Sequence, residues 1–214
     1  YYFQHRFDFA SAENYIKKAL PIFQRLQGEN GADVANSLVF LANVLKSMKK
    51  YDEAARALER AIRIREKFNG DSMETAQSLA ALASVYQLEG KLNPCIELLE
   101  KALKMAQSED RGSAFASQLM CRLGVSYLEM HRYKKAEELL KTSLEIARSW
   151  GPEAITEPQH HLASLYVELG KYKEARVLEE ISVKQIASSF GEDSVDAAIL
   201  KFQKANIMRL EGHY

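Results

Sequence analysis

One feature constrains the fold of this chain more than any other: a short phrase of sequence recurs at intervals of about 40 residues. The clearest copy is LASLYVELGKYKEA at residues 162–175, in which a helical stretch is followed by a Gly-Lys-Tyr break and a second helix start. Small residues recur at one position of the phrase, and these are Ala42, Ala83, Gly124, Ala163 and Ala205. Self-similarity with such a period predicts stacked repeats rather than a single globular core.

Four further columns of residues follow the same register. Three residues after the small position stands a bulky side chain, with Phe3, Leu45, Tyr86, Tyr127, Tyr166 and Met208 in that column. An aromatic residue or leucine follows the break, and that column holds Phe9, Tyr51, Leu92, Tyr133, Tyr172 and Tyr214. Two later columns of small residues are Ala12, Ala54, Cys95, Ala136 and Ala175, and then Ala19, Ala61, Ala102, Ser143 and Ser182. Agreement in five columns is too regular for chance, so the chain consists of internal repeats.

Each repeat contains two stretches with helical spacing of apolar residues. Leu38, Leu41 and Leu45 stand at i, i+3 and i+7 before the break, and Leu58 and Ile62 stand at i and i+4 after it. This spacing predicts an amphipathic helix on each side of the break, and therefore a pair of helices in every repeat. We expect the small columns where two helices cross, because a larger side chain there would hold the backbones apart.

The columns also predict where each repeat begins and ends. The predicted units are a partial repeat at 1–32, full repeats at 33–71, 72–112, 113–151 and 152–191, and a lone first helix at 192–214. The outermost units are incomplete, and neither has the polar outer face that caps a natural repeat array. We therefore expect this sequence to be a segment of a longer protein.

Several capping signals predict helix starts. Asn93 followed by Pro94 is typical of a capping residue and a first-turn proline. Two pairs resemble capping boxes, Asp71 with Glu74 and Thr156 with Gln159. Pro158 is expected to delay the start of its helix, since proline disfavours a helical conformation of the preceding residue.

The columns resemble the tetratricopeptide repeat (TPR), in the long variety of about 42 residues found in kinesin light chain and nephrocystin-type proteins. LASLYVELGKYKEA and the segment KYDEAARALERAIRIREKFNG at residues 50–70 carry the resemblance best, and it extends over practically the whole chain. The resemblance implies an all-α fold, a right-handed superhelical α-solenoid of antiparallel helix pairs. It also implies that the first helix of each pair lines a concave groove.

Polar residues dominate the positions that would face this groove. Side-chain amides can hydrogen-bond the backbone of an extended or helical peptide without requiring a charge on it. The candidate groove residues are Asn36, Asn43, Lys46, Gln77, Ser84, Gln87, Gln118, Arg122, His160 and Asn206. We predict that they contact a protein or peptide partner, although a merely hydrated surface would have the same composition.

Charge and hydropathy exclude several other partners. Lys and Arg together number 29, as do Asp and Glu, so the formal net charge is zero. A balanced chain lacks the basic field that nucleic acid would need, and no apolar run is long enough to span a membrane. We expect no nucleic-acid partner and no membrane span. Cys95 and Cys121 stand in apolar helical patterns and indicate a reduced, intracellular protein, most simply a cytoplasmic one, although an organelle stays open.

No catalytic or metal-binding motif is recognisable. None of the five histidines pairs with Cys, Asp or Glu at the spacing of a metal site, and adjacent His160 and His161 should point in different directions. Cys121 could be a reactive thiol in the groove, but a buried, inert cysteine is the simpler interpretation. The sequence therefore predicts no enzyme activity, no cofactor and no bound metal.

The resulting interpretation is a non-enzymatic adaptor or scaffold, similar to kinesin light chain, that binds a partner segment in the concave groove. Kinesin light chains usually carry paired asparagines on each first helix, and this chain does not, so the same cargo is not expected. Of the carboxylate clamp found in chaperone-binding TPR proteins, only Asn43 and Arg122 stand in compatible columns. Two alternatives remain: a structural or self-associating spacer that contacts other parts of its own longer chain, and the regulatory arm of an enzyme whose catalytic domain lies outside this segment.

Overall fold

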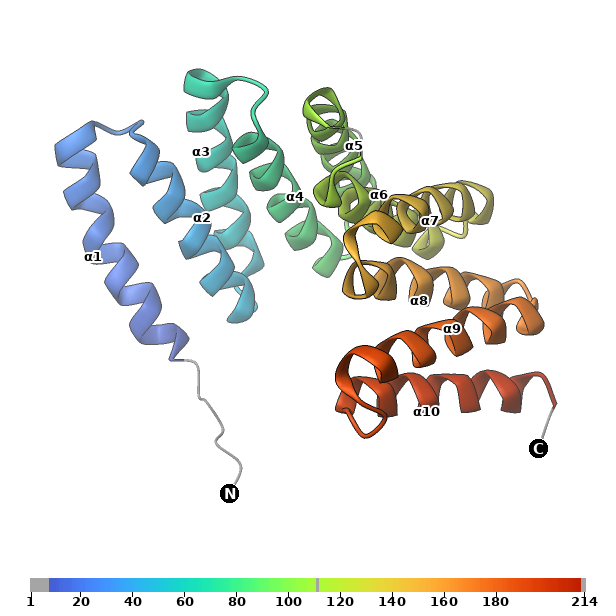
Figure 1. The fold of residues 1–214 in the computed structure, drawn as a ribbon. Coiled ribbons are helices and arrows are strands. Elements are labelled where there is room, and N and C mark those ends of the chain that lie inside the picture. The colour runs from blue at the N-terminus through green and yellow to red at the C-terminus, as the bar shows by residue number, and fades with distance from the viewer. Residues whose placement is uncertain (1–7, 111, 213–214) are drawn as a thin grey trace. The chain divides into compact units, whose positions relative to one another are not determined.

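A computed structural model describes residues 8–110 and 112–212, and in this part the chain forms ten α-helices, one short 3-10 helix and no strand (Figure 1). The helices are α1 (Phe9–Gln27), α2 (Ala32–Ser47), α3 (Tyr51–Asn69), α4 (Met73–Leu88), α5 (Leu92–Glu109), α6 (Ala114–Glu129), α7 (Tyr133–Ala147), η1 (Arg148–Trp150), α8 (Pro152–Glu168), α9 (Tyr172–Phe190) and α10 (Val195–Leu210). The predicted all-α class is confirmed for these residues. Phe3, His5, His213 and Tyr214 lie outside the described part of the chain.

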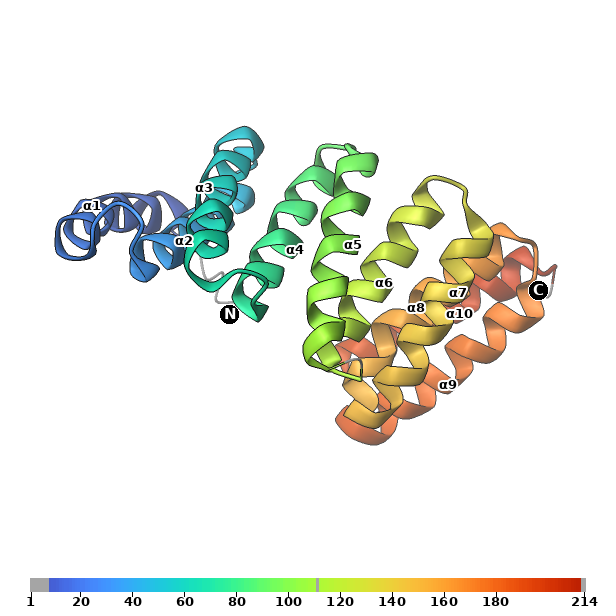
Figure 2. The ribbon, with the colours of Figure 1, turned by 90° about the horizontal axis from the view of Figure 1, so that it is seen from above.

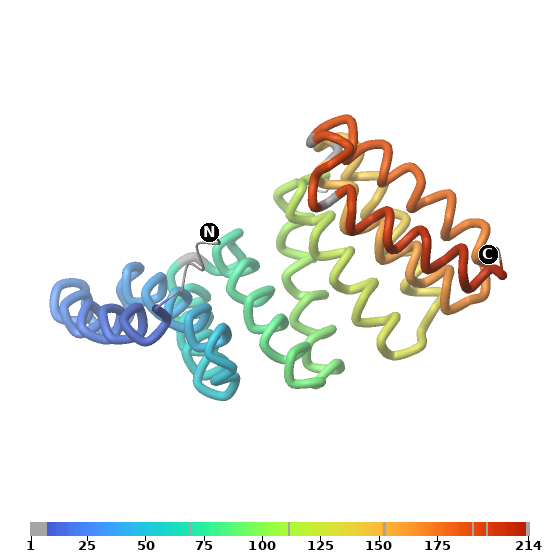
Figure 3. The backbone as a smooth tube through the Cα atoms, turned by 90° about the horizontal axis from the view of Figure 1, so that it is seen from below, coloured from blue at the N-terminus to red at the C-terminus, as the bar shows by residue number. Residues whose placement is uncertain are grey.

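The chain forms two compact units, Tyr1–Met105 and Ala106–Tyr214, which divide within α5. In the first unit α1 packs on α2, α2 on α3 and α3 on α4. In the second unit each helix from α6 to α10 packs on the next one in sequence, as Figures 2 and 3 show from opposite sides. First helices also contact one another, α2 with α4 and α6 with α8, as expected when helix pairs stack.

Most members of the small columns are buried between helices, as the sequence predicts, whereas Ala205 on α10 is exposed. Ala54, Ala136 and Ala175 are completely buried. A Cβ atom added to Gly124 in α6 would lie 2.7 Å from Cγ of Leu140 in α7, so the two helices approach closely at this point. Small residues thus permit the close packing of each helix pair.

The break in the repeated phrase is a tight turn with the same geometry in four copies. The residue that begins the turn has positive φ in each copy: Lys49 (60°), Gly90 (72°), His131 (56°) and Gly170 (68°). The N–H of the next residue then donates to the carbonyl of the bulky column, in the pairs Lys50 to Leu45, Lys91 to Tyr86, Arg132 to Tyr127 and Lys171 to Tyr166. This pattern is that of a Schellman motif, which satisfies carbonyl groups at the helix end. The bulky column therefore supplies both a packing side chain and the acceptor that closes the turn.

Three predicted capping residues are wrong, and these are Asp71, Asn93 and Thr156. Ser72, not Asp71, caps α4, because its hydroxyl accepts a hydrogen bond from the Thr75 N–H. Helix α5 begins at Leu92, so Asn93 lies inside the helix and is not its cap, whereas Pro94 lies in the first turn as predicted.

Helix α8 begins at Pro152, and Thr156 and Pro158 lie inside it. Proline is favourable in the first turn of a helix, because backbone N–H groups there have no intrahelical acceptor and proline therefore loses no hydrogen bond. Further along α8, Ile155 and Pro158 are both buried, and this packing offsets the hydrogen bond that Pro158 cannot donate.

Candidate partner-binding site

In the first unit, the predicted contact residues lie on α2 and α4. Asn36, Asn43 and Gln77 are exposed, whereas Lys46, Ser84 and Gln87 are half-buried. The Lys46 ammonium group donates a 3.1 Å hydrogen bond to the Ser84 hydroxyl, which connects α2 to α4. This hydrogen bond joins two of the predicted contact residues across the two helices.

Asn36 is part of a hydrogen-bonded network that the sequence did not predict. The Arg65 guanidinium in α3 donates to Asn36 Oδ1 at 2.7 Å and to Ser78 Oγ in α4 at 2.7 Å. Burial lowers the pKa of Arg65, although the nearby Glu74 carboxylate opposes this effect. Asn36 thus helps to hold α2, α3 and α4 together, and its carbonyl oxygen already has a partner.

An apolar groove of about 390 Å³ lies beside Asn43, between α1 and α2. It is lined by Phe9, Ile16, Ala19, Ser37, Phe40, Asn43, Val44 and Ser47. The Phe40 side chain is 67% exposed, although a large aromatic residue is usually more buried. The groove combines an exposed aromatic ring with an exposed amide, which suits contact with both the side chains and the backbone of a peptide.

In the second unit, the predicted residues are Gln118 and Arg122 on α6, His160 on α8 and Asn206 on α10. Gln118 and Asn206 are exposed, whereas Arg122 and His160 are half-buried. The Asn206 side-chain oxygen accepts hydrogen bonds from the Arg209 guanidinium at 3.1 and 3.3 Å. Asn206 therefore belongs to a local pair on α10.

His160 pairs with a buried acid that the sequence did not predict. Its Nδ1 atom lies 3.2 Å from Oε1 of Glu179 in α9, and Glu179 is only 1% exposed. The hydrogen bond with Glu179 raises the pKa of His160, and burial of the imidazole opposes this shift. The other Glu179 oxygen, Oε2, and Oε1 of Gln203 are buried without a hydrogen-bond partner. These acceptors lie near the contact of α8, α9 and α10 and could receive donors from a bound molecule.

Two cavities adjoin this pair, with volumes of about 400 and 300 Å³. Both contain His160 and Gln203 in their lining. The larger cavity is also apolar, with Ile186, Ile199 and Leu200 in its wall. The second unit thus has its own pairing of an apolar depression with polar groups.

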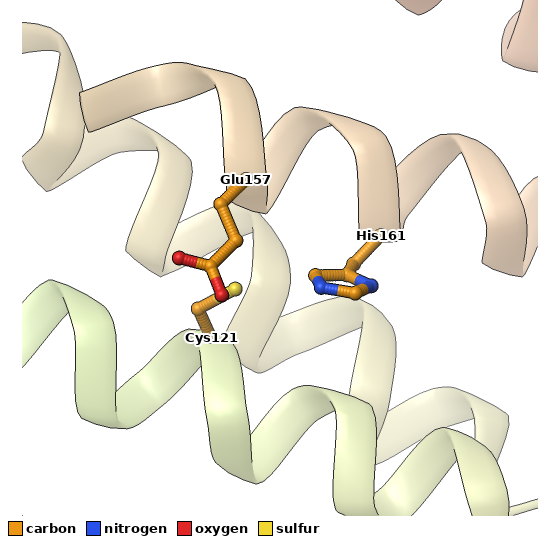
Figure 4. A group of neighbouring side chains, drawn as sticks. All are labelled: Cys121, Glu157 and His161. Carbon is orange, nitrogen blue, oxygen red and sulfur yellow. The ribbon is translucent and has the colours of Figure 1, made fainter. Parts of the chain in front are cut away.

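Cys121 is 1% exposed, which confirms the prediction of a buried cysteine. Burial raises the pKa of its thiol, and the Glu157 carboxylate adds to this effect. Ligand atoms of Cys121, Glu157 and His161 all lie within 4.8 Å of one another (Figure 4). The expectation that no histidine stands at metal-site spacing from Cys, Asp or Glu is wrong, because Glu157 and His161 stand one helical turn apart on α8. That spacing was the available signal, and Cys121 completes the group only through packing of α6 against α8.

Trp150, the single tryptophan of the chain, lies close to this group. Its indole N–H donates to the Gly112 carbonyl at 2.9 Å, which ties η1 to the segment that precedes α6. Trp150, Cys121, Glu157 and Gln118 are among the residues that line a cavity of about 90 Å³. The intrinsic fluorescence of Trp150 can therefore report changes in this part of the second unit.

Comparison with known families identifies the repeat. The family model of the tetratricopeptide repeat matches residues 1–67, 72–149 and 115–183. The chain belongs to the tetratricopeptide repeat family. Such repeats are typically scaffolds that bind other proteins. A search of curated proteins found no match. Among the described residues, no helix combines the length and apolarity needed to cross a membrane.

Several solved structures have the same TPR architecture. BtubC (BKLC) from P. vanneervenii has a TM-score of 0.83 and 15% identity, over 96% of this chain and 85% of that chain. A Podosopora anserina protein assigned as a kinesin light chain has a TM-score of 0.72 and 21% identity, over 85% of this chain and 89% of that chain. Aspartyl phosphate phosphatase F from Bacillus subtilis has a TM-score of 0.81 and 14% identity, over 93% of this chain but 51% of that chain. At these identities the likeness shows the fold alone.

Proposed function

We propose that this TPR chain is a non-enzymatic adaptor that binds an extended or helical segment of a partner protein on its first-helix surfaces. The observation that carries the proposal is the groove between α1 and α2, where Phe40 and Asn43 are both exposed. An apolar side chain of the partner would enter the groove beside Phe40. The Asn43 amide would then hydrogen-bond the partner backbone.

The neighbouring helix extends this surface within the first unit. Gln77 on α4 is exposed, and the hydrogen bond between Lys46 and Ser84 joins its helix to α2. A partner segment that leaves the groove can therefore continue across α4 and meet a second amide. Asn36 contributes less to this contact, because its carbonyl oxygen accepts from Arg65.

The second unit supports the same kind of contact with different chemistry. Its apolar depression adjoins His160 and Gln203, and buried acceptor oxygens of Glu179 and Gln203 lie close by. We expect this unit to favour a partner segment that carries a donor, such as a lysine or arginine, next to an apolar residue. Gln118 and Arg122 on α6 would add contacts within the same unit.

Likeness to kinesin light chain concerns the fold alone. A cytoplasmic location stays a prediction. Regulation of an enzyme domain elsewhere in a longer chain also stays a prediction.

Peptide selection tests the proposal directly. Displayed random peptides would be selected on the purified chain, and the dissociation constant of a selected peptide would be measured by fluorescence anisotropy. Phe40→Ala and Asn43→Asp should each weaken binding by about tenfold, the effect of losing about 1.4 kcal/mol at a central contact.

Tyr15→Ala is a matched control for Phe40→Ala. Tyr15 is similarly exposed, at 71%, and it lies on α1 but does not line the groove. Its replacement should change the dissociation constant by less than about twofold. The proposal fails if no peptide is selected, or if selected peptides bind the Phe40→Ala and Tyr15→Ala variants equally well.

Self-association is a second candidate, and a feature of α10 favours it. Val195, Ile199 and Phe202 stand on one face of the helix and are 75%, 50% and 76% exposed. A second copy of the chain could cover this apolar stripe. Sedimentation should then show a dimer that Phe202→Glu converts to a monomer. A monomer at all concentrations would exclude this candidate.

A further inference from the structure

The most specific unassigned chemistry in the described residues is the side-chain group of Cys121, Glu157 and His161. One ligand atom from each residue, a sulfur, a carboxylate oxygen and an imidazole nitrogen, lies within 4.8 Å of the other two. Figure 4 shows Glu157 and His161 descending from α8 toward Cys121 on α6. Two of the donors come from one helix and the third from the helix packed against it, so the group bridges adjacent helix pairs.

We propose that this group binds Zn²⁺, with Cys121, Glu157 and His161 as its three protein ligands. Sulfur, imidazole and carboxylate together suit zinc, whereas Mg²⁺ and Ca²⁺ prefer oxygen alone. Water occupies the fourth position of the tetrahedron. The proposal does not depend on the partner-binding function.

The distances agree with a zinc site before the ion enters. With metal–ligand bonds of about 2.0–2.3 Å, the ligand atoms of a tetrahedral site are roughly 3.3–3.8 Å apart. Ligand atoms within 4.8 Å of one another therefore need to close by on the order of 1 Å. Glu157 is exposed, so rotation of its side chain can supply part of this movement at little cost in packing.

The surroundings provide space and access for the ion. Cys121 and Glu157 both line the cavity of about 90 Å³, which also contacts Trp150 and Gln118. A cavity of this size holds a water molecule with room to spare. As the Zn–S bond forms, the thiol proton of Cys121 leaves to solvent, and the nitrogen lone pair of His161 and a carboxylate oxygen of Glu157 complete the protein ligands.

The site would act as a clamp between two neighbouring repeats. Zinc that binds the folded chain and not the unfolded one raises the stability of the folded state. Helices α6 and α8 belong to different helix pairs, so the ion would connect them across the boundary between repeats. The binding reaction can be followed without any partner protein.

Cobalt is the first probe, because Co²⁺ occupies zinc sites and is visible spectroscopically. The reduced, chelator-treated chain should bind one equivalent of Co²⁺ and develop a thiolate-to-cobalt charge-transfer band in the near ultraviolet. Zn²⁺ should displace the cobalt and remove the band. Co²⁺ should also quench the fluorescence of Trp150, since this single tryptophan lines the same cavity.

Substitutions then assign the ligands. Cys121→Ser should abolish the charge-transfer band, and Glu157→Gln and His161→Gln should each weaken Zn²⁺ binding by at least about tenfold. The matched controls are His160→Gln, whose ring faces Glu179, and Cys95→Ser, the other buried cysteine. Both controls should bind zinc within about twofold of the unchanged chain, with circular dichroism verifying that every variant is folded.

A measurement on the unchanged chain removes any dependence on variants that fail to fold. One equivalent of Zn²⁺ should slow alkylation of Cys121 more than that of Cys95, as measured by mass spectrometry of the labelled peptides. The proposal is overturned if one equivalent of Co²⁺ produces no charge-transfer band. It is equally overturned if zinc protects neither cysteine, or if the folded His160→Gln chain loses binding as fully as His161→Gln.

Discussion

Gly124 in α6 faces Leu140 in α7 so closely that an added Cβ would lie 2.7 Å from Cγ and 2.9 Å from Cδ2 of the leucine. Leu140 is completely buried, so it has little room to move aside. We expect Gly124→Leu to lower the free energy of unfolding by about 1–3 kcal/mol, the usual cost of overpacking a core. Urea denaturation followed by circular dichroism measures this change.

Ala205→Leu is the control for the same column of the repeat. Ala205 stands at the equivalent position on α10 but is exposed. Its replacement should change the stability by less than about 0.5 kcal/mol. Equal effects at the two positions would contradict the assignment of this column to helix crossings.

The turn in two repeats has a non-glycine residue with positive φ, at Lys49 and His131. A left-handed conformation costs an L-residue roughly 1–2 kcal/mol, and glycine avoids this cost. Glycine also has more freedom in the unfolded chain, which offsets part of the stability gained by the substitution. Lys49→Gly should therefore raise the free energy of unfolding by about 0.5–1 kcal/mol. His131→Gly should gain less, because it loses the 2.9 Å contact between His131 Nδ1 and the Tyr133 hydroxyl.

The reverse change provides the counterpart. Gly170 has φ of 68° in the same turn, so Gly170→Ala should destabilise the chain by about 1 kcal/mol. Thermal and urea unfolding of the three variants would give this order of stability. A loss of stability in Lys49→Gly would show that its side chain contributes more than its backbone conformation costs.

Ser117 and Ser143 form a buried reciprocal pair between α6 and α7. Each hydroxyl donates to the backbone carbonyl of the other residue, at 2.9 and 2.8 Å, and the two hydroxyl oxygens are 3.0 Å apart. Each single replacement by alanine should cost about 0.5–1.5 kcal/mol. The double replacement should cost less than the sum, with a coupling of at least about 0.5 kcal/mol in a double-mutant cycle. Ser47→Ala, at an exposed serine, serves as the control, and strict additivity would argue against the pair.

Stability should also depend on pH through Glu137. Its hydrogen bond with Lys141, with help from Tyr166, holds the pKa of the carboxyl group below its ordinary value of 4.5. A lowered folded-state pKa contributes stability that is present above the unfolded value and is lost as the pH falls through the folded value. The difference in unfolding free energy between the unchanged chain and Glu137→Gln, below about 1 kcal/mol at pH 7, should therefore disappear in acid.

Glu138→Gln is the control for this pH dependence, because it removes an exposed carboxylate from the next position of the same helix. Its unfolding free energy should follow that of the unchanged chain. A Glu137→Gln chain with an unaltered pH profile would exclude a stabilising role for the contact with Lys141.

The repeat columns were predictable from the sequence because their physical cause is local and recurrent. Ala54, Ala136 and Ala175 occupy the same position in three repeats and are all buried between helices, so each copy supports the others. Helix starts were less predictable, since Asp71 and Ser72 are neighbouring capping residues and only backbone geometry decides between them. Pro158 was misjudged because burial of α8 outweighs its local preference.

The candidate site was predictable only in part. Asn43 and Gln77 are exposed, which follows from their place in the helical period, and their contact with a partner stays a prediction. The contacts of Asn36 with Arg65 and of His160 with Glu179 depend on the side-chain rotamers of residues that lie on different helices. Predicting the group of Cys121, Glu157 and His161 would require two inferences. The first is that Glu157 and His161 lie on one face of α8, and the second is that this face packs against Cys121 on α6.

The hydrogen bond that closes each turn joins residues only five positions apart, from Lys50 to Leu45 and from Lys171 to Tyr166. A gene segment that encodes one such phrase therefore encodes its own bend, with no contribution from the neighbouring unit. Tandem duplication can therefore lengthen the protein, because each new copy contains the residues that form its own turn. Selection is then left to act on the outward-facing side chains of each new copy.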